Sequence, residues 1–225
     1  MNRLALALAV ATFAIAPISA HQAMQPQAAP PAQPQAQRPL SPPGTATTMV
    51  GGSWVKNAEG NSVYEGGKWI EVSYSRPMLR QRANIFGTGA DYGTAVKAGA
   101  SVWRAGANST TTLKTEVPLV FGGKTVPAGE YGLLVDLKSP TEWTLILTSQ
   151  PRMAAFDPNN KTELNGATNY DPKFDVVRVP MQVDSSAAMS VDQFTILFCD
   201  VTKDSGKLAI VWDKTAAMAP FTVGR

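Results

Sequence analysis

The amino-acid sequence predicts an all-β protein whose folded part is an antiparallel β-sandwich. Short stretches of alternating apolar and polar residues recur at intervals of about eight to twelve residues, separated by Gly, Pro, Asn and Asp. No segment after Trp54 has the period of an amphipathic helix. Because several stretches are apolar on both faces, we expect two packed sheets. The sequence does not distinguish a jelly-roll-like from an immunoglobulin-like arrangement.

The first twenty residues are typical of a secretory signal peptide. Arg3 precedes an apolar run from Leu4 to Ala16, and Pro17 is followed by the small-residue stretch 18–20. This run is shorter than the roughly twenty residues that a membrane-spanning helix needs. We therefore expect residues 1–20 to direct export and the rest of the chain to be periplasmic or secreted, without membrane insertion.

Residues 21–50 are predicted to be a disordered or extended spacer. Ala, Gln and Pro dominate this stretch, and large apolar side chains are almost missing from it. Such a composition cannot bury a core. Residues 51–225 are then predicted to form a single β-sandwich domain, long enough to bury roughly 70% of the surface of its unfolded chain.

A hairpin is predicted in the middle of this domain. Its strands are Glu130–Leu137 and Trp143–Thr148, and residues 138–142 have turn composition. Alternation divides each strand into an inward and an outward face. The inward residues are Tyr131, Leu133, Val135 and Leu137 on the first strand and Trp143, Leu145 and Leu147 on the second.

Three further strands are predicted towards the C-terminus. Phe174–Val183 alternates with period two, and Pro180 places it at the edge of a sheet, because proline cannot donate to a ladder. Gln193–Val201 and Lys207–Trp212 flank the turn 203–206 and form a second hairpin. Its core-facing residues are Phe194, Ile196, Phe198, Leu208, Ile210 and Trp212.

Composition excludes several classes of function. The net charge of +3 is too small for a nucleic-acid-binding protein. His21 is the single histidine and Cys199 the single cysteine, so the folded domain cannot hold a Ser-His-Asp triad, a Cys-His pair, a histidine-built zinc site or an internal disulfide. His21 could chelate copper only with a second histidine, and loop 157–163 lacks the glycine of a calcium loop. We expect no metal or cofactor.

Carboxylates leave one catalytic alternative open. A glycan hydrolase needs two acids about 5 to 10 Å apart across a cleft. Asp171 with Asp175, or Glu71 with Glu116, could be placed in this way, but the sequence does not show that they are. A carboxylate-dependent hydrolase is therefore an alternative to a protein without enzymatic activity.

Positive charge is concentrated in residues 72–115. This segment contains six Lys and Arg residues against the single acid Asp91. An anionic or polar ligand would find complementary charge here. The candidate ligand-binding residues are Arg76, Arg80, Arg82, Tyr92, Trp103, Arg104 and Asn108.

Two interpretations of these residues stay open. In the first, they form a pocket whose guanidinium groups bind a carboxylate, phosphate or sulfate and whose aromatic faces stack on sugar rings. In the second, the arginines donate to loop carbonyls, Trp103 belongs to the core, and Arg104 is its neighbouring clamp. A third alternative is an envelope protein that presents a sheet face or edge to a protein partner of unknown identity.

The motifs Ser75-Arg76-Pro77, Trp103–Asn108 and Pro127–Tyr131 give a family resemblance. With the strands downstream, they resemble in order a bacterial secreted family catalogued as domain of unknown function twenty-nine eleven, over residues 69–223. The resemblance implies the fold class and an envelope location and brings no established activity. Residues 80–84 depart from the family's Arg-Gly-Arg pattern and the stretch 92–103 is longer than usual, which predicts a remodelled loop near the candidate site.

Overall fold

The structure is a computed structural model that describes residues 39–224, so the predicted signal peptide and residues 21–38 lie outside the described residues. No helix in this part of the chain has the length and hydropathy needed to cross a membrane. Its elements are β1 (Pro43–Val50), β2 (Ser53–Lys56), β3 (Ser62–Glu65), β4 (Lys68–Ser75), η1 (Gly89–Asp91), α1 (Thr94–Lys97), β5 (Thr112–Thr115), β6 (Leu119–Phe121), β7 (Lys124–Val126), β8 (Gly129–Ser139), β9 (Glu142–Thr148), η2 (Pro172–Phe174), β10 (Asp175–Pro180), β11 (Gln182–Asp184), β12 (Val191–Cys199), β13 (Ser205–Asp213) and β14 (Thr215–Val223).

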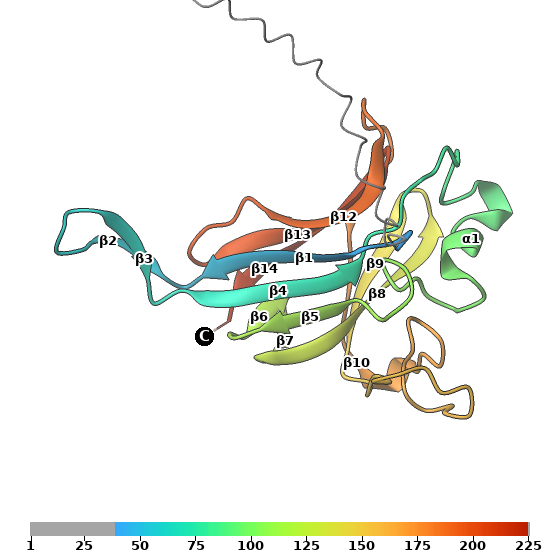
Figure 1. Cartoon of the computed structure of the whole chain (residues 1–225), viewed down its shortest axis with the longest axis horizontal. Coiled ribbons are helices and arrows are strands. Elements are labelled where there is room, and N and C mark those ends of the chain that lie inside the picture. The colour runs from blue at the N-terminus through green and yellow to red at the C-terminus, as the bar shows by residue number, and fades with distance from the viewer. Residues whose placement is uncertain (1–38, 225) are drawn as a thin grey trace, which may run out of the picture. The chain divides into compact units, whose positions relative to one another are not determined.

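Two antiparallel sheets pack face to face, which confirms the predicted β-sandwich (Figure 1). The first sheet has the order β1-β4-β5-β8-β9-β10. The second has the order β12-β13-β14-β6-β7, and β11 also pairs with β14. The hairpin β2-β3 forms a separate two-stranded sheet that projects at one end (Figure 1).

The core between the sheets follows the predicted alternation. Every inward residue predicted on β8 and β9 belongs to the main buried cluster, and so do Phe194, Ile196, Leu208, Ile210 and Trp212 from the second sheet. Both predicted hairpins are present, as β8-β9 and β12-β13. Period-two patterning therefore identified the residues that form the core.

A second, smaller apolar cluster covers the outer face of β8 and β9. Leu134 and Ile146, which alternate with the inward residues, pack there against Val102, Leu164 and Ala167 from two loops. The loop 149–174 is thus held against the outer face of the first sheet.

The predicted boundary at residue 50 is wrong. Residues 43–50 form β1, which pairs with β4 along its whole length, from Pro43 opposite Ser75 to Val50 opposite Lys68. Only Ala46 and Val50 of this strand are buried. Backbone hydrogen bonds at a sheet edge hold β1 in place, so its composition gave no apolar pattern to detect.

The predicted strand 174–183 is divided between the two sheets. Its first part is β10, the last strand of the first sheet, so Pro180 does lie at an edge. Its second part is β11, which pairs with β14 in the other sheet. The chain crosses at Met181, whose N–H donates to the carbonyl oxygen of Trp143 over 2.9 Å. Alternation continues through the crossing, because the side chains of both strands face the same core.

Strand β14 was not predicted, and it contains Pro220, a residue type that is rare in interior strands. The structure shows why proline fits there. On one side β14 pairs with β11 over residues 216–218 and with β6 over residues 221–223. Pro220 lies between these two paired stretches, where its missing N–H costs no ladder bond.

Candidate functional site

The candidate site residues lie in the long connection between β4 and β5, residues 76–111. Six of the nine non-glycine residues with positive φ in the described chain occur here: Arg80, Gln81, Asn84, Ala98, Ala105 and Asn108. Such backbone persists only where surrounding contacts fix it, and it is frequent at functional sites. Two mutual backbone hydrogen bonds of 2.8 Å between Trp103 and Val135 fix this connection to β8.

Trp103 and Tyr92 are core residues. Trp103 is 0% exposed and packs against an aromatic cluster from both sheets. The Tyr92 hydroxyl accepts a 2.8 Å hydrogen bond from the indole N–H of Trp143. Burial raises the pKa of Tyr92, and the bond from Trp143 opposes that shift. Both side chains therefore serve packing, which the structural interpretation expected for Trp103 and not for Tyr92.

Arg76 and Arg82 donate mainly to the protein itself. Arg76 reaches the carbonyl oxygen of Phe194 over 3.5 Å, which ties the loop to β12. Arg82 donates to the carbonyl oxygens of Leu79 and Met78 over 2.9 and 2.7 Å. Its guanidinium also lies 5.8 Å from the ring centre of Trp212. These two arginines clamp the loop, whereas Arg80 is exposed.

Arg104 is different, because its half-buried charge is not compensated. One Nη1–H donates to the carbonyl oxygen of Asn108 over 2.9 Å. Within residues 39–224, Arg104 forms no ion pair with a carboxylate. Burial lowers its pKa, although a guanidinium stays protonated at neutral pH. A Cβ at Gly166 would lie 2.7 Å from Nη1 and 3.0 Å from the carbonyl oxygen of Asn108, and the φ of +62° at this position favours glycine.

Two hollows meet at Arg104 and Asn108. The smaller, of about 300 Å³, is lined by Arg82, Ile85, Ala95, Val96, Trp103, Arg104, Gly106, Ala107, Asn108 and Trp212. The larger, of about 660 Å³, is lined by Arg104, Asn108, Ser109, Thr110, Thr112, Arg152, Met153, Ala154, Ala155, Phe156 and Asn165. The structure thus brings four of the seven candidates together and does not bring Arg76, Arg80 or Tyr92 into either lining. Sequence reasoning missed Arg152, which lies far away along the chain and pairs with Glu130.

Comparison with known proteins identifies the family. The family model described as protein of unknown function (DUF2911) matches residues 57–221. The chain belongs to the DUF2911 family. No curated protein and no solved structure matches it. The match to DUF2911 includes the whole β4-β5 connection and both hollows at Arg104, whereas β1 precedes it.

The acid pairs of this DUF2911 protein are engaged in local contacts. Glu71 and Glu116 do line one shallow hollow on the outer face of the first sheet, together with Thr47, Trp69 and Lys114. There Lys114 lies directly opposite Glu71 across the strands, and Glu116 accepts a 2.9 Å hydrogen bond from the Trp69 N–H. A lysine is thus the cross-strand neighbour of one acid, and a backbone hydrogen bond fixes the other on the outer sheet face.

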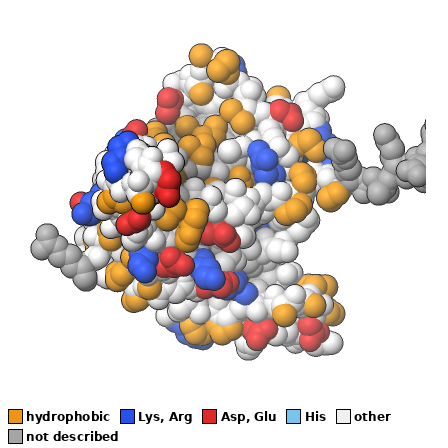
Figure 2. Space-filling model, turned by 60° about the vertical axis from the view of Figure 1, so that its left-hand side comes forward, with side chains coloured by type: hydrophobic (Ala, Val, Ile, Leu, Met, Phe, Trp, Pro, Cys, Tyr) orange, Lys and Arg blue, Asp and Glu red, His pale blue; other side chains and the backbone are white. Residues whose placement is uncertain are grey.

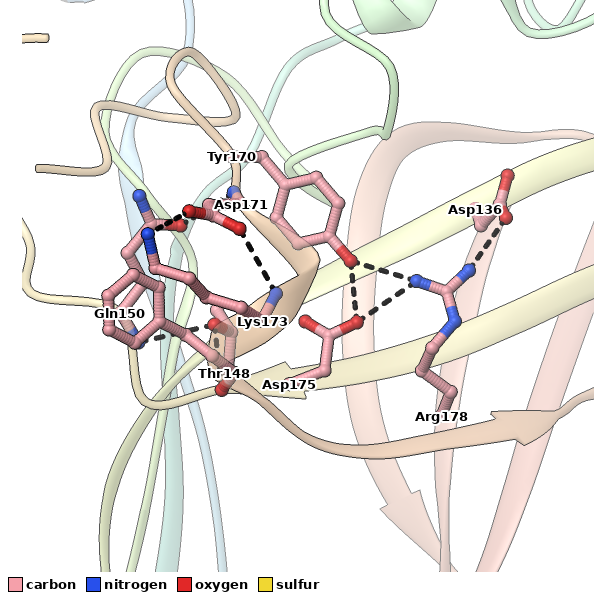
Figure 3. Close-up of polar contacts among 9 residues, drawn as sticks. Asp136, Thr148, Gln150, Tyr170, Asp171, Lys173, Asp175 and Arg178 are labelled. Carbon is pink, nitrogen blue, oxygen red and sulfur yellow. Dashed lines mark hydrogen bonds and ion pairs between the residues drawn. The ribbon is translucent and has the colours of Figure 1, made fainter. Parts of the chain in front are cut away.

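The second pair belongs to separate networks, which Figure 3 shows. Asp171 pairs with Lys173 over 2.5 Å and also accepts its N–H. Asp175 accepts from the Tyr170 hydroxyl over 2.6 Å and from Arg178 over 3.1 Å. Each carboxylate therefore has its own partners, and the two acids do not share a contact in these networks.

A polar clasp, made of Asp136, Tyr170, Asp175 and Arg178, ties the loop 149–174 to the first sheet (Figure 3). Arg178 on β10 donates to Asp136 on β8 over 2.9 Å and to the Tyr170 hydroxyl over 2.8 Å. The Asp175 side chain is only 7% exposed. Because Tyr170 belongs to the loop 149–174, the clasp ties the later part of this loop to β8 and β10. The alternation of the sequence puts Arg178 on the face opposite Val177 and Val179, but it gave no signal of its partners.

Tyr170 makes the stability of this DUF2911 protein sensitive to alkaline pH. Burial and the Asp175 carboxylate raise the pKa of the Tyr170 phenol far above its usual value. An unfolded tyrosine loses its proton above about pH 10, whereas folded Tyr170 keeps it. The free energy of unfolding should therefore fall as the pH rises above 10, by at most about 1.4 kcal/mol per pH unit for this residue.

Urea denaturation of wild type and Tyr170→Phe from pH 9 to 11 measures this contribution. The variant should lose stability less steeply above pH 10, while the difference between the two proteins stays constant below it. Equal slopes above pH 10 would show that Tyr170 ionises normally in the folded protein.

Proposed function

We propose that this DUF2911 protein is exported and acts as a non-enzymatic binding protein for a small anionic or polar molecule, with Arg104 at the centre of its site. The uncompensated guanidinium of Arg104 carries this proposal. A half-buried charge without a counter-ion is unfavourable, and an anion that bonds to its free N–H groups would relieve this. No other candidate arginine combines partial burial with a place in both hollows.

The larger hollow, here called the Arg104 hollow, supports the proposal by its lining. Hydroxyl and amide groups of Ser109, Thr110, Thr112 and Asn165 surround the space beside Arg104. A volume of about 660 Å³ lies within the range of small-molecule sites. The lining contains no carboxylate, imidazole or thiol from the described residues, which favours binding over acid-base or nucleophilic catalysis.

A thermal-shift experiment with phosphate, sulfate and succinate tests the proposal. A probe at one hundred times its dissociation constant adds about 2.7 kcal/mol of stability, which raises the melting temperature by about 5–10 °C. At least one probe should stabilise wild type in this way. The shift should disappear in Arg104→Gln and shrink in Arg104→Lys, because lysine lacks the planar fork.

Arg80→Gln is the matched control, since Arg80 is exposed and outside both hollows. It should keep the whole ligand-induced shift. Each shift is measured from the variant's own melting temperature, so a loss of stability in Arg104→Gln does not mask the result. Absence of any shift in wild type, or an unchanged shift in Arg104→Gln, would refute the proposal.

A further inference from the structure

Another hollow, away from Arg104, lies beside the β2-β3 hairpin, at the opposite end of the described structure from α1 (Figure 1). We call it the aromatic hollow. It measures about 660 Å³ and is lined by Met49, Gly52, Ser53, Trp54, Tyr64, Trp69, Val201, Thr202 and Lys203. Figure 2, which brings the hairpin end forward, shows hydrophobic side chains gathered around a recess with charged side chains beside it.

The two tryptophan rings of this hollow are exposed. Trp54 and Trp69 are 72% and 49% exposed, whereas the other three tryptophans are at most 3% exposed. The indole N–H groups of Trp143 and Trp212 donate to protein oxygens. Those of Trp54 and Trp69 have no acceptor within residues 39–224. Two large exposed rings lining one hollow form an apolar patch of the kind that marks an interaction site, and their indole N–H groups, which water can hydrate in the free protein, can donate to a ligand.

The backbone holds one ring of this hollow in a fixed position. The Tyr64 hydroxyl accepts a 3.1 Å hydrogen bond from the Gly52 N–H, and its ring packs edge-to-face against Trp54 with centres 5.4 Å apart. A Cβ at Gly52 or Gly67 would lie 2.6 Å from a ring atom of Tyr64. Glycine at both positions therefore lets the ring lie against the backbone, and the site is preorganised before a ligand arrives.

The chemistry of the lining selects a class of ligand. A sugar ring has an apolar C–H face that stacks on an aromatic side chain and a polar edge that accepts from an indole N–H or a hydroxyl. Lys203 adds a positive charge at the hollow and forms no ion pair within the described residues. An ammonium group pairs well with a carboxylate. We propose that the aromatic hollow binds a carboxylate-bearing sugar ring of an acidic polysaccharide.

Intrinsic fluorescence reports directly on this hollow, because Trp54 and Trp69 are the exposed tryptophans. The probe is a hexamer of galacturonate, and maltohexaose is the neutral control. In the chain without residues 1–20, the galacturonate hexamer should change the emission saturably and maltohexaose should not. Trp54→Ala should weaken binding about tenfold or more, as loss of a central aromatic contact does. Lys203→Gln should weaken it severalfold.

Arg104→Gln separates this inference from the proposed function, since Arg104 does not line the aromatic hollow. It should leave binding of the galacturonate hexamer unchanged. No binding by wild type, binding that survives Trp54→Ala, or equal binding of maltohexaose would overturn the inference. Loss of binding in Arg104→Gln would also overturn it, by assigning the sugar to the Arg104 hollow. Because Trp54 is exposed, circular dichroism should confirm that Trp54→Ala is folded.

Discussion

Replacing Trp103 with alanine should lower the free energy of unfolding by about 4 kcal/mol, the cost typical of a large aromatic side chain removed from a core. Trp103 is 0% exposed and contacts Phe86, Trp143, Phe194 and Trp212 from several elements. The smaller side chain would leave a cavity between the sheets, and the two backbone bonds to Val135 would lose the packing that supports them. Chemical denaturation measures the effect.

Trp69→Ala is the matched control, since it removes the same side chain from the exposed face of β4. It should cost less than about 1 kcal/mol, because little buried surface is lost. If the two variants were equally stable, Trp103 would not be a core residue, and its role in ligand binding would have to be considered again.

Replacing Arg178 with methionine should cost about 2 kcal/mol. Methionine keeps most of the apolar stem but removes the charge that faces Asp136 and Asp175. Asp175, 7% exposed, would then carry a buried charge without a cation. Breaking a fully buried pair costs about 3–5 kcal/mol. We expect a smaller cost for Arg178→Met than for a fully buried pair, because Arg178 is 38% exposed and water screens part of the interaction.

Lys138→Met provides the comparison for this clasp variant. Lys138 and Glu142 form an ion pair in which the side chains are 57% and 61% exposed. Its loss should cost much less than the loss of Arg178, because water screens an exposed pair. Adding Asp175→Asn to Arg178→Met should recover part of the lost stability, since the buried charge is then removed as well. Equal costs for Arg178→Met and Lys138→Met would mean that the clasp behaves as a surface ion pair.

These predictions separate the two roles, ligand binding and structural support, that the sequence left open for the same residues. Arg76, Arg82 and Trp103 have their interactions within the protein, so their substitution should change stability first. Arg104 has guanidinium N–H groups without a protein acceptor among the described residues, and it lines two hollows, so its substitution should change ligand-induced stabilisation. Residues 152–156 and Asn165 of the loop 149–174 line the Arg104 hollow, and Tyr170 ties the later part of the same loop to the clasp.

The sequence by itself determined which strand residues face the core. In β8, β9, β12 and β13 the side-chain period of two is a local property of extended backbone, so alternation identified the buried face without knowledge of the partners. It also identified Pro180 as an edge residue and the β4-β5 connection as the place where positive charge collects. Family membership followed from motifs in the same segment.

Only the tertiary structure decided what each candidate residue does. An arginine is a clamp or a ligand group according to its surroundings, and Arg76 meets its acceptor Phe194 at a distance of 118 positions along the chain. Strand β1 is held by backbone bonds to β4, and Pro220 is tolerated where two neighbouring strands meet, so neither shows in local composition. These outcomes depend on contacts between distant segments, and for that reason a pattern confined to neighbouring residues could not reveal them.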